Sequence, residues 1–140
     1  WWGFKREAED GIAENAAFVD AAGGCAIMHS DIPLLGSLLN VEAARAAAAG
    51  RRAGLVIPPE KAIRWITSNP AKALALESQI GRIAAGMNAD LVLWSGNPFS
   101  IYSKADLVFI DGAVAYDRHG ASAQRPSDFE LGRPQKEALP

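Results

Sequence analysis

Apolar and charged positions alternate at helical spacing through residues 5–22. Steps of three and four residues place four apolar side chains on one face, with charges between them: Ala8, Ile12, Ala16 and Val19. This spacing predicts an amphipathic helix, and Gly23-Gly24 ends it. The apolar run Cys25–Met28 follows between glycines and polar residues, as a buried strand would. A helix, a glycine turn and a strand in this order are typical of one unit of a parallel α/β sheet.

Three further helices are predicted before the pattern changes. The second covers residues 38–53, and Gly54 is suited to cap its C-terminus. Pro58-Pro59 opens the third, because proline is tolerated in the first helical turn. Its shared apolar face is formed by Ala62, Ile63 and Ile66. The fourth is short, with Asn69 as N-cap, Pro70 at the first helical position and its body in residues 71–76.

The pattern becomes strand-like after Gly81. Strands are predicted over residues 90–94, 106–110 and 113–116. Only Asp111-Gly112 separates the last two, and this dipeptide favours positive φ at both positions of a two-residue hairpin turn. The second half of the chain is therefore predicted to be an antiparallel sheet.

The two ends of the chain differ from the rest. Trp1-Trp2-Gly3-Phe4 begins without methionine and without the basic-then-apolar order of a signal peptide. We therefore expect the natural protein to begin further upstream, where these apolar side chains would have packing partners. Residues 119–140 are polar with several prolines, and we expect them to form an extended tail over the surface.

Composition narrows the possible partners. The 140 residues carry a formal charge of −2, with 49% apolar and 21% charged residues, which is typical of a globular domain. This near-neutral balance argues against a nucleic-acid or anionic-membrane partner, since both require clustered Lys and Arg. The apolar stretches are too interrupted for a membrane span of about 20 residues. Cys25 is the only cysteine, so an intrachain disulfide is excluded and the redox compartment stays open.

Reactive side chains gather in His29-Ser30-Asp31, where the predicted strand ends. If the extended conformation persists to residue 31, His29 and Asp31 point to the same side. Ligands of parallel α/β folds collect beyond the carboxyl ends of strands. An aspartate there can ligate a metal, accept a proton from bound water, or cap the following loop. Because Asp31 lies two residues before Pro33, an Asx turn is the simpler local explanation, and both alternatives stay open.

The other reactive residues have simpler structural explanations. A lone histidine such as His29 beside a strand end is more often hydrogen-bonded in a core than a ligand. Ser30 lacks the G-x-S-x-G context of a serine nucleophile. His119 is expected to face solvent, and Cys25 to be buried and inert.

A catalytic zinc site keeps three protein ligands. The chain has 2 histidines and 1 cysteine, and it lacks H-x-H, H-E-x-x-H and C-x-x-C pairs. Its own motifs therefore do not predict a complete metal site.

Several segments together resemble the C-terminal portion of metal-dependent amidohydrolases. The likeness is to the branch of imidazolonepropionase-like enzymes and of metallo-dipeptidases acting on prolyl or arginyl substrates, and it covers about residues 1–118. AAGGCAIMHSD resembles the eighth barrel strand with its terminal aspartate. WITSNPAKALALESQIGRIAAGMNADLVLWSGNPF resembles the passage out of the barrel, and KADLVFIDGAVAYD resembles the closing hairpin of a small β-sandwich.

The resemblance assigns roles to few residues. It implies that Asp31 is catalytic, taking a proton from the attacking water, and that it coordinates or neighbours a divalent metal, zinc by expectation. It makes His29 at most a substrate-binding neighbour. A structural signature matches at Asn69, Pro70, Gly81, Gly86 and Asp90. Ala75 and Ala85 stand where the family pattern leads us to expect glycine and proline.

The departures from the family pattern are as important as the matches. The family's first-strand His-x-His, its bridging ligand and its middle-strand histidines have no counterpart here. A complete (β/α)₈ barrel takes about 250 residues, more than this chain contains. The chain alone is therefore expected to hold no metal and to be inactive.

These observations predict an α/β fold, namely a C-terminal fragment of a (β/α)₈ TIM-like barrel followed by part of a small β-sandwich. The expected divisions are residues 1–80 for the barrel part, 81–118 for the sandwich part and 119–140 for the tail. The implied activity is hydrolysis of a C–N amide bond in a cyclic amide or small peptide. The alternative is a non-catalytic α+β module that binds through the open edge of the incomplete barrel. Both require association with an N-terminal barrel portion, a second copy, or both.

Overall fold

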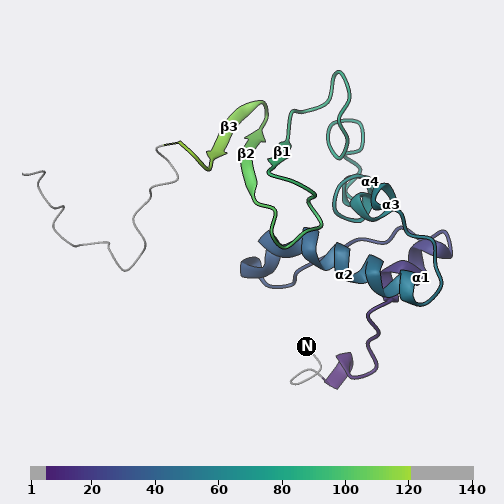
Figure 1. Ribbon diagram of the computed structural model, residues 1–140. Coiled ribbons are helices and arrows are strands. Elements are labelled where there is room, and N and C mark those ends of the chain that lie inside the picture. Colours follow the sequence, from purple (N-terminus) through teal and green to yellow (C-terminus); the bar gives the residue numbers. More distant parts are fainter. Residues whose placement is uncertain (1–5, 121–140) are drawn as a thin grey trace, which may run out of the picture.

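The computed structural model describes residues 6–120, in which a group of short helices precedes one small sheet (Figure 1). The helices are η1 (Arg6–Ala8), α1 (Asn15–Ala21), η2 (Pro33–Leu38), α2 (Leu39–Arg52), α3 (Pro59–Ala62), η3 (Ile63–Ile66) and α4 (Ser68–Ala73), where η marks a 3₁₀ helix. The strands are β1 (Leu91–Trp94), β2 (Ala105–Ile110) and β3 (Ala113–Asp117). Nearly all of the predicted tail lies outside the described residues. Within the described part, no helix is long and apolar enough to span a membrane.

The core lies where α1, α2 and η3 meet. Among the described residues, its fully buried large side chains are Ile57 and Trp65, at 2% and 0% exposure. The other buried members are Ala17, Ala26, Ala43, Ala46, Ala47 and Ala62. Because alanine side chains are short, α1 and α2 approach closely, and a Cβ added at Gly50 would lie 2.4 Å from the Ala17 Cβ. The crossing therefore requires glycine at position 50.

The second and third predicted helices are confirmed. α2 covers Leu39–Arg52, within one residue of the prediction at each end. The expected Gly54 cap is also present, with φ +88°. The Gly54 N–H donates to the Arg51 carbonyl at 3.1 Å, and the Leu55 N–H donates to the Gly50 carbonyl at 3.0 Å, which is the Schellman pattern. α3 and η3 together form the helix predicted from Pro58-Pro59.

The first predicted helix is wrong in its extent and in its buried face. η1 and α1 are separated by residues 9–14, and Gly11 lies in the break, since glycine costs a helix about 1 kcal/mol relative to alanine. Ile12 and Val19 are 54% and 42% exposed. Ala17 faces α2 instead, because only a small side chain fits the close crossing.

The predicted strand Cys25–Met28 is not a strand within the described residues. A strand needs a neighbour on its hydrogen-bond ladder, and η3 and α4 take that place here. The Met28 N–H donates to the Trp65 carbonyl at 3.0 Å, and Asn69 Nδ2 donates to the Ala26 carbonyl at 2.7 Å. Cys25 is exposed, so its predicted burial is wrong.

The start of the fourth helix is also predicted wrongly. α4 begins at Ser68 with Thr67 as its N-cap residue, so Asn69 is its second residue and Pro70 its third. Asn69 does not cap the helix because its side chain bonds to Ala26. Proline is still tolerated at this position, since it lies in the first turn.

The predicted sheet and hairpin are confirmed. The strand order is β1-β2-β3, with both pairs antiparallel. Asp111 and Gly112 form the hairpin turn with φ 49° and 80°, as expected for a type I′ turn. A contact with this turn explains why Asp90 belongs to the structural signature: the Asp90 Oδ1 accepts the Asp111 N–H at 2.9 Å.

The loop between β1 and β2 joins the sheet to the helices. Asn40 Nδ2 on α2 donates to the Pro98 carbonyl at 2.6 Å, and Phe99 packs against the core cluster. In Figure 1 this loop reaches down from the sheet to α2. The loop is therefore the structural link that fixes the sheet against the helical part.

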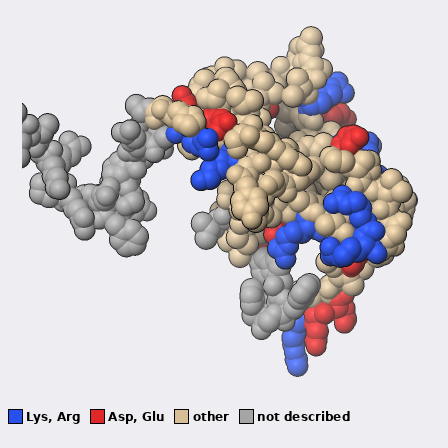
Figure 2. All heavy atoms as spheres, viewed as in Figure 1, with Lys and Arg blue, Asp and Glu red and all other residues tan. Residues whose placement is uncertain are grey.

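Both faces of the sheet present apolar side chains. The register pairs Val92 with Val108 on one face and Leu93 with Leu107 on the other. Val92 and Leu93 are nevertheless 45% and 54% exposed. Figure 2 shows that uncharged residues form most of the visible surface, with small groups of acidic and basic side chains between them. Sheets that are apolar on both faces are normally covered on both.

The close helix crossing can be tested by exchanging its two small residues. Gly50→Ala should lower the free energy of unfolding by about 1–3 kcal/mol, because its Cβ overlaps Ala17. Ala17→Gly should lower it by about 1 kcal/mol alone, but should raise it in the Gly50→Ala background. Urea denaturation of the four proteins measures this reversal of sign, and additive losses would contradict the crossing.

The end of α4 offers a gain in stability. Ala75 has φ +57°, and its N–H and that of Leu76 donate to the Lys72 and Ala71 carbonyls at 3.1 and 2.8 Å. This is a helix cap that favours glycine. Ala75→Gly should therefore raise the free energy of unfolding by about 0.5–1 kcal/mol, after the entropic cost of glycine.

A matched control lies two residues earlier. The same substitution inside α4, Ala73→Gly, should lower the free energy of unfolding by about 1 kcal/mol. Thermal denaturation of the two variants measures the difference, and a loss at both positions would refute the left-handed cap.

Candidate active site

The segment that ends in Asp31 is held from one side. The Ala26 carbonyl and the Met28 N–H are both bonded to the η3–α4 turn, through Asn69 and Trp65 respectively. Trp65 is fully buried, and Ala26 is 4% exposed. The first part of the segment is therefore anchored in the core, while His29 and Asp31 beyond it are exposed.

Asp31 does not continue an extended strand. Its φ is +57°, in the left-handed region, where non-glycine residues are uncommon but aspartate is among the better tolerated. The condition for His29 and Asp31 to share one side is therefore not met. Non-glycine residues in this region cluster at functional sites as well as in turns. The backbone geometry is consistent with either role considered for Asp31.

His29 forms the turn that leads to Asp31. Its Nδ1 accepts the Asp31 N–H at 3.0 Å, which is the side-chain-to-backbone spacing of an Asx turn with histidine in place of asparagine. This contact requires Nδ1 to be unprotonated. The interpretation of His29 as a core histidine is wrong, because the residue is exposed. Its suggested part in substrate binding stays a prediction.

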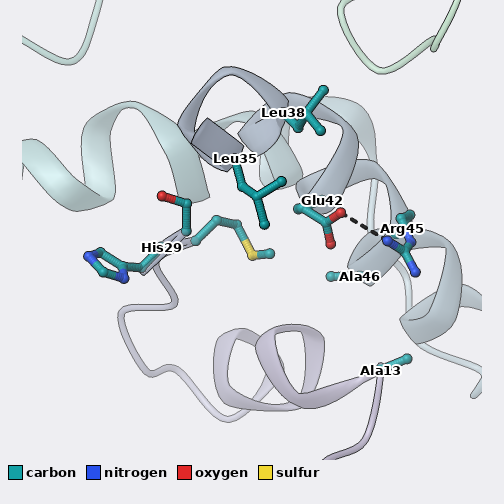
Figure 3. A pocket seen from close by; sticks show the side chains of 9 residues that line it. Ala13, His29, Leu35, Leu38, Glu42, Arg45 and Ala46 are labelled. Atoms are coloured by element: carbon teal, nitrogen blue, oxygen red, sulfur yellow. Dashed lines mark hydrogen bonds and ion pairs between the residues drawn. The ribbon is translucent and has the colours of Figure 1, made fainter. Parts of the chain in front are cut away.

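A cavity of about 470 Å³ adjoins this turn (Figure 3). It is lined by Ala13, Met28, His29, Ser30, Leu35, Leu38, Glu42, Arg45 and Ala46. Arg45 Nη1 and Glu42 Oε1 form an ion pair at 2.9 Å on its wall. Figure 3 shows His29 pointing away from Leu35 and Glu42. The pair has side chains 74% and 43% exposed, so it contributes little to stability.

The remaining candidate ligands do not gather around Asp31. Within residues 6–120, no three His, Cys, Asp or Glu side chains are close enough to hold a metal ion together. His119 is exposed as predicted, with its Nε2 3.3 Å from Arg118 Nη2. The residue that sequence reasoning missed is Asn69, which contacts the segment directly. Its partner Ala26 lies 43 positions away, so no local pattern could have identified the bond.

Comparison with known sequences identifies the family. A profile of the amidohydrolase family matches residues 9–117. The chain belongs to the amidohydrolase family. The resemblance inferred from the sequence motifs is thereby confirmed.

Individual relatives agree with this assignment. Amidohydrolase tasK of Hapsidospora irregularis is 31% identical over 115 residues, which are 81% of this chain and 11% of that protein. Imidazolonepropionase of Aliivibrio salmonicida is 50% identical over 67 residues, which are 44% of this chain and 16% of that protein. The crystal structure of an amidohydrolase from Thermotoga maritima matches with a TM-score of 0.67 and 37% identity, over 82% of this chain and 29% of that one.

The chain spans only part of these relatives, between 11% and 29% of their lengths. Membership of the family therefore applies to the matched residues. Enzymes of this family generally use divalent metals.

Proposed function

We propose that this chain supplies the last barrel strand, the flanking helices and part of the small sheet of an enzyme that hydrolyses a C–N amide bond. The observation that carries the proposal is the family match, which extends over residues 9–117 and includes the segment ending in Asp31. The substrate class is a cyclic amide or a small peptide. Several relatives named imidazolonepropionase support the hydrolase class.

The proposed chemistry of this chain centres on the Asp31 carboxylate. Asp31 lies in an exposed turn that follows the anchored residues 26–28. Its carboxylate is therefore accessible to water and substrate. Acting as a general base, it takes a proton from the attacking water and gives it to the leaving nitrogen. His29 supports this role by fixing the turn through its contact with the Asp31 N–H.

The described residues do not make up a metal site by themselves. We therefore derive no step through a metal from this chain. In the proposal, Asp31 would be one oxygen ligand of a divalent ion, zinc by expectation, whose other ligands would come from outside residues 6–120. Such an ion would supply an activated water and polarise the scissile carbonyl.

The proposal also requires a protein partner, namely the N-terminal barrel portion, with or without a second copy of the chain. Two observations support it. The N–H groups of Cys25, Ile27 and His29 have no hydrogen-bond partner among residues 6–120, and unpaired edges of this kind associate with strands. Apolar side chains on both sheet faces are half exposed, as at Val92 and Leu93. The proposed partner is a protein, and the proposal includes neither a nucleic acid nor a membrane as a partner.

A non-catalytic assembly module is the second candidate. The same open edge favours it, because association needs no catalytic carboxylate. The two candidates differ in the upstream reading frame. A His-x-His strand encoded there favours the enzyme, whereas a gene that begins near Trp1 favours the module.

The test of the enzyme is Asp31→Asn in the protein assembled with the N-terminal portion encoded upstream. Asparagine keeps the size of aspartate and its tolerance of positive φ, so folding should be unchanged. Loss of the general base should lower kcat for amide hydrolysis by about 100-fold or more. The assay follows cleavage of the C–N bond, which opens the ring of a cyclic amide and releases an amine from a small peptide.

Asp10→Asn is the matched control, because Asp10 is an exposed carboxylate in the loop before α1. It should stay within about twofold of wild type, since isolated surface substitutions have small effects. Wild-type turnover in Asp31→Asn would remove Asp31 from the mechanism and leave it a turn residue.

A further inference from the structure

The η3–α4 turn holds the Asp31 segment through the Asn69 side chain and the Trp65 carbonyl, and Cys25 Sγ lies 3.8 Å from the Asn69 carbonyl oxygen. Asn69 Nδ2 donates to the Ala26 carbonyl at 2.7 Å in a half-buried position. The Trp65 carbonyl accepts the Met28 N–H at 3.0 Å. Both groups come from the η3–α4 turn, so together they fix one side of the segment at two points. Asn69 is the only one of the two that acts through its side chain.

Asn69 is itself held in a rigid place. Ala71 on the same helix is 2% exposed, and a Cβ added at Gly81 would lie 2.6 Å from the Ala71 Cβ and 3.1 Å from the Thr67 carbonyl oxygen. Pro70 follows Asn69 directly and restricts its backbone. Because the turn is closely packed, the Asn69 side chain has little freedom to move. The Ala26 carbonyl to which it donates is therefore held in place as well.

We propose that Asn69 is a positioning residue for Asp31. By holding the Ala26 carbonyl, its amide sets the place of the segment from which the His29 turn presents the Asp31 carboxylate. The anchor at Ala26 is followed by the Met28–Trp65 bond and then by the contact of His29 Nδ1 with the Asp31 N–H. This inference rests on the proposed function, because the place of Asp31 affects turnover only if Asp31 acts in catalysis.

Two substitutions remove the anchor in different ways. Asn69→Ala deletes the amide, and Asn69→Asp keeps its shape but places a carboxylate oxygen against the Ala26 carbonyl oxygen. A displacement of about 1 Å at a catalytic group can cost about 100-fold in rate. We expect kcat to fall by about tenfold or more in both variants, with KM within about twofold, because the general base and not the substrate contacts is displaced.

Thr67→Val is the matched structural control. Thr67 Oγ1 donates to the Ile63 carbonyl at 2.8 Å from the same half-buried turn, so its hydroxyl bonds within the turn and not to the segment that carries Asp31. Its removal also costs one hydrogen bond of about 1 kcal/mol. If Asn69 positions Asp31, Thr67→Val loses comparable stability and keeps kcat within about twofold of wild type.

The experiment compares kcat, KM and urea stability of wild type, the two Asn69 variants, Thr67→Val and Asp31→Asn in the assembled protein. Hydrogen exchange at the Met28 amide adds a readout that does not depend on activity, and it should accelerate in the Asn69 variants only. Wild-type kcat in both Asn69 variants, beside an inactive Asp31→Asn, would overturn the positioning role and leave the function intact. Equal losses of kcat in Thr67→Val would reduce Asn69 to a structural residue. Turnover that is the same in wild type and in Asp31→Asn would instead overturn the proposed function.

Discussion

The structure depends on how the backbone of residues 25–28 satisfies its polar groups. Backbone N–H and C=O groups bond to protein or to water, and within the described residues this segment has no strand beside it. The η3–α4 turn bonds to Ala26 and Met28 on one side. The amides of Cys25, Ile27 and His29 have no partner among residues 6–120. One anchored side and one open side are what a strand of a larger sheet would show.

The same asymmetry connects the fold to the proposed chemistry. The alanine-rich core and Trp65 hold the η3–α4 turn, and the turn holds the segment that carries His29 and Asp31. An accessible carboxylate on a firmly anchored segment suits a general base. The sheet is incomplete in a similar way, because its apolar side chains Val92 and Leu93 are half exposed. Apolar sheet faces are normally covered by other parts of a protein. Both features are consistent with a chain that matches only 29% of its Thermotoga maritima relative.

Sequence reasoning succeeded where the physical cause is local. The Asp111-Gly112 hairpin and the Gly54 cap follow from the conformations available to two or three adjacent residues. It failed where the partner is distant in the chain. Asn69 looks like an N-cap, yet its bond to Ala26 spans 43 positions. Cys25–Met28 looks like a strand, but within residues 6–120 the distant η3–α4 turn stands where a neighbouring strand would be. Asp31 is a predicted site residue because it follows an apolar run, whereas its left-handed backbone and the contact of His29 with its N–H depend on the turn as a whole.

The central proposal is that the open side of this segment, at the amides of Cys25, Ile27 and His29, pairs with a strand from outside this chain. Hydrogen exchange at the amides of Cys25, Ile27 and His29 measures this directly, in the 140-residue chain and in the protein assembled with its N-terminal portion. The account predicts fast exchange in the chain alone and slowing by about 100-fold or more in the assembly, as expected for amides in a sheet. Equally fast exchange in both would contradict the account.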